Sequence, residues 1–152
     1  MDYDEQYDKI YRYCYYKVRD KNLAEDITQE TFLRFLDSRY REQGKKIQYL
    51  YTIARNLCSD HFRNNKQMVQ IHDAIKPSEK SGFEEEINFR YDIRQALSKL
   101  SEEDREILLL KYANEEKDAV ICSLFGLSRF SLYRRLHRLQ KLVRKNLPGY
   151  TS

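Results

Sequence analysis

The chain has 152 residues, a formal net charge of +4 and 41% apolar residues, which is enough for one ordinary domain or two very small ones. No run approaches the roughly 20 apolar residues that span a membrane, and the acidic start of the sequence is unlike a signal peptide. The length excludes a large enzyme, and we expect a cytoplasmic protein.

Glycine and proline are scarce, with four and two residues respectively, too few for the many turns of a β-sandwich or barrel. We therefore predict an all-α protein made of two small helical domains joined by a flexible linker. The cysteines, Cys14, Cys58 and Cys122, form no CxxC pair, so neither a zinc site nor a disulfide framework is indicated. We expect buried structural thiols and no metal or cofactor.

The predicted linker covers residues 67–90. It contains a Pro-Ser-Glu-Lys-Ser-Gly stretch and three consecutive glutamates, and it shows little periodicity. The domains on either side are then residues 1–66 and 91–152. The composition of the linker leads to the hypothesis that the two lobes can fold together, or be sequestered, until a partner holds them apart.

Apolar residues at helical spacing predict three helices in the first domain. The first covers about residues 7–18, the second about 24–35 and the third about 47–66. A basic loop over residues 38–46 connects the last two.

The same spacing predicts four helices in the second domain. The first covers about residues 89–100, and Ser101 then opens a capping box for a second helix. A short helix over about 116–125 and a long helix over about 128–147 complete the domain.

The last two helices have the spacing of a helix-turn-helix. Cys122 is small enough for two helices to cross closely, Gly126 can adopt the positive φ of the turn, and Leu132 can pack the second helix onto the first.

The final helix is strongly basic, with seven cationic and no acidic residues over positions 129–145. Such a face is typical of phosphate binding, and its longer side chains can reach base edges in a major groove. A solvated basic face without a partner is the alternative.

The third helix combines aromatic and basic residues, which suit unstacked single-stranded bases. These residues are Tyr49, Tyr51, Arg55, Asn56 and Arg63. Core packing is the competing interpretation for both tyrosines.

The second helix carries Asp26, Gln29 and Glu30 on one face. A protein-docking surface is favoured over an active site, because no catalytic motif accompanies these carboxylates. A solvated helix face is the simpler alternative. The weakest alternative is a small nuclease or transferase that uses Asp26, Glu30, Asp60 and His61.

Two segments of the first domain, residues 24–32 (AEDITQETF) and 49–57 (YLYTIARNL), resemble conserved region 2 of the extracytoplasmic-function (ECF) sigma factors. Residues 97–147, with Gly-Leu-Ser at 126–128 and Arg-Leu-His-Arg at 135–138, resemble region 4 of the same family. The resemblance covers both domains in the family's order.

The resemblance implies a transcription initiation factor that is not an enzyme. Its expected partners are core RNA polymerase, through the β′ clamp helices and the β flap, promoter DNA and an anti-sigma factor, with no small-molecule substrate. A stand-alone helix-turn-helix regulator of transcription is the alternative.

The resemblance also implies three sets of site residues. The polymerase-binding set is Asp26, Gln29, Glu30 and Phe32. The set that holds the melted −10 strand is Tyr49, Tyr51, Arg55, Asn56 and Arg63. The set that binds the −35 duplex is Arg129, Ser131, Tyr133, Arg134, Arg135, His137 and Arg138. Tyr133 and Arg134 depart from the family's usual pair, so the −35 sequence cannot be taken from relatives.

Overall fold

The computed structural model describes residues 3–38, 44–64 and 94–146, and every regular element within these ranges is helical. The all-α prediction is therefore confirmed. None of the described helices is both long enough and apolar enough to cross a membrane.

The first lobe consists of α1 (Tyr3–Val18), α2 (Lys21–Asp37) and α3 (Lys46–Asn64), which pack against one another. Asp20 caps α2, because its side chain accepts a hydrogen bond from the Leu23 backbone N–H at 3.1 Å. Cys14 and Cys58 are fully buried in the core of this lobe as free thiols. These two cysteines are therefore buried as predicted, whereas Cys122 in the second lobe is only partly buried.

The second lobe begins with helical residues 94–98 and continues through α5 (Glu102–Leu108) into a π-helical turn, η2 (Leu109–Ala113). Ser101 caps α5 as the capping box predicted, accepting a hydrogen bond from the Asp104 backbone N–H at 3.1 Å. The helices α6 (Asp118–Phe125) and α7 (Arg129–Lys145) follow.

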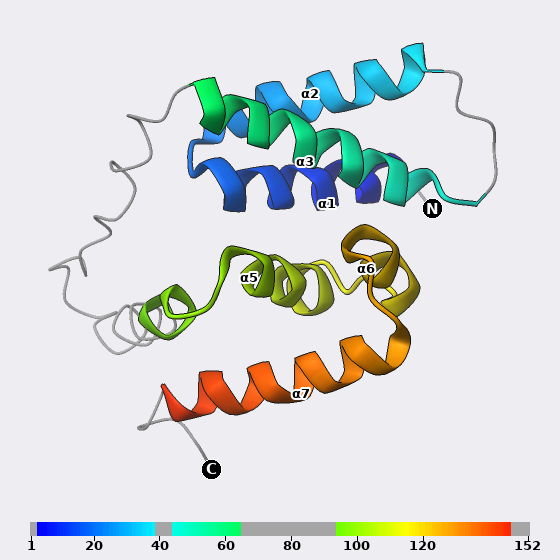
Figure 1. Ribbon diagram of the computed structural model, residues 1–152. Coiled ribbons are helices and arrows are strands. Elements are labelled where there is room, and N and C mark those ends of the chain that lie inside the picture. The colour runs from blue at the N-terminus through cyan, green and yellow to red at the C-terminus, as the bar shows by residue number, and fades with distance from the viewer. Residues whose placement is uncertain (1–2, 39–43, 65–93, 147–152) are drawn as a thin grey trace, which may run out of the picture.

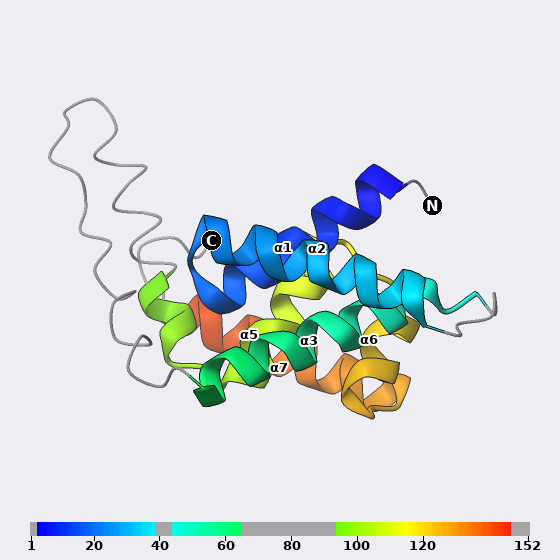
Figure 2. The same ribbon diagram turned by 90° about the horizontal axis from the view of Figure 1, so that it is seen from above.

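The lobes stack in three tiers, with α1, α2 and α3 in the first, α5 and α6 in the second, and α7 farthest from the first lobe (Figure 1). Seen from above, the first lobe lies over part of the second, and α6 projects beyond it (Figure 2). One continuous apolar cluster joins them, and it includes Ile10 and Leu50 from the first lobe and Ile107 and Ile121 from the second. The predicted linker, residues 67–90, lies outside the described residues.

Candidate nucleic-acid interface

The turn between α6 and α7 has the geometry that the sequence predicted for a helix-turn-helix. Gly126 ends α6 in the left-handed conformation, with φ of 65°, which favours glycine because a Cβ is strained there. Ser128 then caps α7 through a hydrogen bond from the Ser131 backbone N–H at 3.0 Å. Leu132 is 1% exposed and packs α7 into the core.

The side of α7 opposite its buried leucines faces solvent. Arg129, Tyr133, Arg134, His137 and Arg138 are all exposed there. Five members of the predicted −35 set therefore lie where a DNA duplex can reach them.

Arg135, another member of that set, is only partly exposed because two carboxylates hold it. Its Nε lies 2.7 Å from Asp104 Oδ1, and one of its terminal nitrogens lies 3.2 Å from Glu103 Oε1. The guanidinium thus connects α7 to the start of α5. Ser131 is also only partly exposed, beside the Ser128 cap.

The predicted −10 set divides between two sides of α3. Tyr49, Asn56 and Arg63 are exposed on one side of the helix. The Tyr49 ring packs edge-on against Phe35, with the centroids 5.8 Å apart, and Arg63 pairs with Asp60 one turn away. These three side chains form an outward stripe that can meet a nucleic-acid strand.

Tyr51 and Arg55 face the second lobe instead. Tyr51 is 1% exposed, so the competing core interpretation is correct for it in this conformation. Arg55 donates a hydrogen bond to the Leu124 carbonyl at 3.2 Å and lies over the Phe125 ring. We correct the expectation that all five residues share one exposed surface, because Asn114 and Glu116 cover Tyr51 and α6 covers Arg55.

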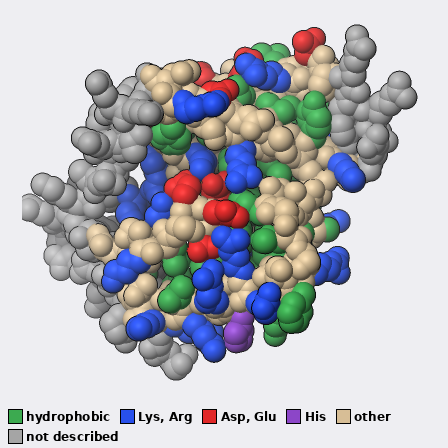
Figure 3. Space-filling model, in the orientation of Figure 1, with side chains coloured by type: hydrophobic (Ala, Val, Ile, Leu, Met, Phe, Trp, Pro, Cys, Tyr) green, Lys and Arg blue, Asp and Glu red, His purple; other side chains and the backbone are tan. Residues whose placement is uncertain are grey.

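The contact between the lobes is built around two buried glutamates of the second lobe. Acidic side chains gather between the lobes on the face that Figure 3 shows, with lysine and arginine side chains above and below them. Glu106 is 3% exposed and Glu116 is 5% exposed. Buried carboxylates are costly unless they are paired and hydrogen-bonded.

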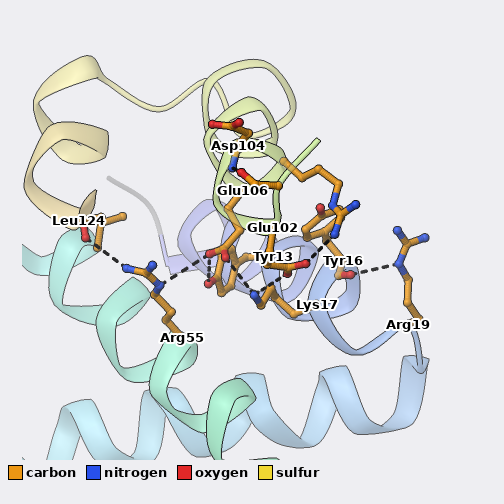
Figure 4. Close-up of polar contacts among 11 residues, drawn as sticks. Tyr13, Tyr16, Lys17, Arg19, Arg55, Glu102, Asp104, Glu106 and Leu124 are labelled. Carbon is orange, nitrogen blue, oxygen red and sulfur yellow. Dashed lines mark hydrogen bonds and ion pairs between the residues drawn. The ribbon is translucent and has the colours of Figure 1, made fainter. Parts of the chain in front are cut away.

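Glu106 receives its partners from α1 and α3 (Figure 4). The Tyr13 hydroxyl donates to its Oε1 at 2.7 Å, Lys17 Nζ donates to its Oε2 at 2.9 Å, and Arg55 Nε lies 3.7 Å away. Lys17 also pairs with Glu102 at 2.7 Å. Burial alone would lower the pKa of Lys17, but Glu106 and Glu102 outweigh it and raise that pKa above its ordinary value.

Glu116 is satisfied in a similar way by two residues of the first lobe. The Tyr51 hydroxyl donates to its Oε2 at 2.7 Å, and Lys9 Nζ lies 3.2 Å from the same oxygen. Asn114 adds to this cluster by donating to the Tyr51 hydroxyl oxygen at 2.9 Å and by accepting from Arg12 at 2.6 Å. The two lobes are thus joined by charged hydrogen bonds as well as by apolar packing.

The tyrosines make this contact sensitive to high pH. Burial, reinforced by the neighbouring glutamate, raises the pKa of both Tyr13 and Tyr51 above the ordinary value of 10.0. Since the closed form holds these protons more tightly, the contact keeps its full strength below about pH 10 and weakens as pH rises above it.

The Tyr51→Phe substitution should remove part of this alkaline sensitivity and cost about 1–3 kcal/mol at pH 8, because it leaves Glu116 short of a hydrogen bond. Thermal unfolding of both proteins between pH 8 and 11 measures the difference. Equal alkaline slopes would contradict the assignment.

The outer face of α2 presents Asp26, Gln29 and Glu30 to solvent. Glu30 pairs with Arg34 at 2.9 Å, and Gln29 donates to Glu25 at 3.3 Å. Phe32, which we expected to share their role, is 6% exposed. Phe32 stacks on Tyr7 inside the lobe, so it lies beneath this face and not on it.

Sequence reasoning missed three exposed apolar residues. Leu33 and Leu36 continue the outer face of α2 and are 60% and 76% exposed, and Phe130 on α7 is 68% exposed. The signal was available in the helical spacing, since Leu33 follows Asp26 by seven residues and Phe130 precedes Arg134 by four.

No group of three or more His, Cys, Asp and Glu side chains in the described ranges is arranged to hold a metal ion. The function of the described surfaces therefore has to be argued from charge, exposure and shape.

Two known protein families match this chain, one in each lobe. The Sigma-70 region 2 family matches residues 3–68, and the Sigma-70, region 4 family matches residues 90–141. Together these matches cover more than three-quarters of the chain.

Two curated relatives are ECF RNA polymerase sigma factors. BldN of Streptomyces coelicolor is 29% identical over 96% of this chain. The chain spans only 59% of the length of BldN. SigM of Bacillus subtilis is 28% identical, over 91% of this chain and 90% of its own length.

A solved structure shares the fold. It is the sigma factor RpoE of Bartonella quintana, crystallised in complex with the anti-sigma factor NepR. The two structures superimpose with a TM-score of 0.67 at 19% sequence identity, and the superposition covers 96% of this chain and 94% of the RpoE chain. Because both sigma-70 regions match in order, and the curated relatives BldN and SigM are ECF sigma factors, the chain belongs to the ECF group of sigma-70 family RNA polymerase sigma factors.

Proposed function

We propose that this protein directs promoter-specific transcription initiation in the cytoplasm by binding core RNA polymerase and recognising two promoter elements. In this proposal residues 1–66 act as sigma region 2, residues 91–152 act as region 4, and residues 67–90 connect them. An anti-sigma factor is a further proposed partner. No covalent chemistry is assigned to the protein.

The observation that carries the proposal is the exposed face of α7. Tyr133, Arg134, His137 and Arg138 are all exposed there, on a helix with seven cationic and no acidic residues over positions 129–145. A helix of this kind, presented by a helix-turn-helix, suits the major groove of a duplex. This supports assigning the −35 element to α7.

The outward stripe of α3 (Tyr49, Asn56 and Arg63) supplies a ring, an amide and a charge for the melted −10 strand. Tyr51 and Arg55 can join that site only when the second lobe moves away from α3. Promoter opening in this proposal therefore requires the lobes to separate. Binding of Asp26, Gln29, Glu30 and the adjacent leucines of α2 to polymerase is the proposed step that holds them apart.

The direct test mixes the purified chain with bacterial core RNA polymerase and measures association and transcription from genomic fragments. Association together with initiation at discrete promoters is the expected result. Failure to associate would overturn the proposal. Tight, sequence-specific duplex binding without polymerase would instead favour the stand-alone regulator.

Two arginines of α7 should behave differently in promoter binding. Arg138→Ala is expected to cost about 1–3 kcal/mol and to relax preference at one −35 position, because Arg138 lies on the reading face. Arg144→Ala should weaken binding to all DNA sequences alike, as the loss of a phosphate contact does. Competition binding of the holoenzyme to a set of −35 variants separates the two, and uniform losses from both would mean that Arg138 does not read bases.

A further inference from the structure

The reading face of α7 carries two large aromatic side chains that the rest of the protein does not cover. Phe130 and Tyr133 are each 68% exposed, whereas the opposite side of the helix buries Leu132, Leu136 and Leu139. Together these two rings, three residues apart on one helix, form an apolar surface that a partner can cover.

Both rings are held by the residue one turn further along α7. The Arg134 guanidinium carbon lies over the Phe130 ring, 5.0 Å from its centroid. The Tyr133 and His137 rings stack, with centroids 6.2 Å apart and planes inclined by 16°. These i, i+4 contacts order the side chains before any partner arrives, which lowers the entropy cost of binding.

The positive charge around these rings favours a DNA duplex as the partner. Arg129, Arg138 and Lys141 are also exposed on α7, and positions 129–145 contain no acidic residue. A protein surface would have to desolvate or neutralise these cations, whereas a DNA duplex supplies phosphates on both sides of its groove. Phe130 is the second residue of α7, and residues at the start of such a helix are the ones that meet base edges.

The chemistry of the major groove then limits what Phe130 can recognise. A phenyl ring has no hydrogen-bond donor or acceptor, and the apolar group that a base pair exposes in that groove is the C5-methyl of thymine. We propose that Phe130 is a specificity-determining residue that contacts a thymine methyl in the −35 duplex. Tyr133 extends the same apolar surface. This inference rests on the proposed function of α7.

The test begins with holoenzyme made from the chain and core RNA polymerase, and with promoters selected from a library randomised in the −35 region. Each thymine of the selected element, on either strand, is then replaced singly by deoxyuridine, which removes only the C5-methyl. We expect binding to fall roughly fourfold at one position, the effect of losing one buried methyl-sized group. Phe130→Ala should bind the unmodified element more weakly and lose this sensitivity to deoxyuridine.

Two control variants make the result specific. Phe130→Leu keeps an apolar side chain and should retain most of the sensitivity, and Arg144→Ala should weaken binding while leaving the sensitivity unchanged. The proposal is overturned if no deoxyuridine substitution matters or if Phe130→Ala remains equally sensitive. Failure of the wild-type holoenzyme to initiate at any promoter would instead overturn the proposed function.

Discussion

Lys17→Glu is expected to separate the two lobes of the free protein. The substitution places a third carboxylate beside Glu102 and Glu106, which Lys17 now contacts at 2.7 and 2.9 Å. Removing one partner of a buried ion pair costs about 3–5 kcal/mol, because the remaining charge is left uncompensated. Separation of the lobes lets water solvate these carboxylates again.

Small-angle X-ray scattering should therefore give a larger radius of gyration for Lys17→Glu, with faster amide exchange in α6 and unchanged helix content. The Lys21→Glu variant is the matched control, since Lys21 is exposed at the start of α2 and undergoes the same change of charge. Lys17→Arg should remain closed. An unaltered radius and unaltered exchange in Lys17→Glu would show that these ion pairs do not hold the lobes together.

Lys17→Glu should also change DNA binding, because the contact between the lobes covers part of the predicted −10 site. Separation uncovers Tyr51 and Arg55, so Lys17→Glu should bind a single-stranded −10 oligonucleotide more tightly than the wild-type protein does. Duplex binding through α7 should change little, because α7 lies on the far side of the second lobe (Figure 1). Fluorescence anisotropy with the two DNA ligands measures both affinities.

The double variant Asp26→Lys/Glu30→Lys should strongly weaken binding to core RNA polymerase. Both side chains are exposed on α2, so the fold should tolerate the change apart from loss of the exposed Glu30–Arg34 pair, which is worth about 0.3–0.5 kcal/mol. Reversing charges within a complementary interface costs several kcal/mol. We expect affinity to fall by at least about thirtyfold, the equivalent of about 2 kcal/mol.

Titration of labelled protein with core polymerase measures this loss, with binding of a −35 duplex as the check that α7 is intact. Asp4→Lys/Asp8→Lys makes the same change of charge at exposed positions of α1 and should bind normally. If the α2 variant bound polymerase as tightly as this control, the docking surface would have to lie elsewhere.

The leucines beside this acidic face should contribute as well. Leu33 and Leu36 expose large apolar surfaces three residues after Glu30 and seven residues after Gln29, respectively, on the same helix, and exposed apolar side chains beside polar ones are typical of a protein interface.

Much of the fold could be predicted from local sequence patterns. The helical spacing predicted the elements, Ser101 and Ser128 cap the helices that follow them, and the left-handed Gly126 marks the turn. Each of these features depends on residues within a turn or two of one another, so their physics can be read along the chain. The basic character of α7 was likewise visible in the sequence.

The roles of individual side chains on those helices could not be read in this way. Tyr49 and Tyr51 lie two residues apart, and a helix turns by about 200° over that interval. One is therefore exposed and the other is buried, although both fit a core or a DNA-binding face by composition. Only the packing of the second lobe on α3 distinguishes them.

The contact between the lobes depended most on tertiary structure. Glu106 and Glu116 look like ordinary surface residues in the sequence, yet their hydrogen-bond partners Tyr13 and Tyr51 lie 93 and 65 positions away. Burial of a carboxylate is favourable only when such distant donors converge on it. The sequence by itself determined the helices, the helix-turn-helix and the charged surface of α7. The tertiary structure decided which side chains are free to bind, because that depends on residues brought together from opposite ends of the chain.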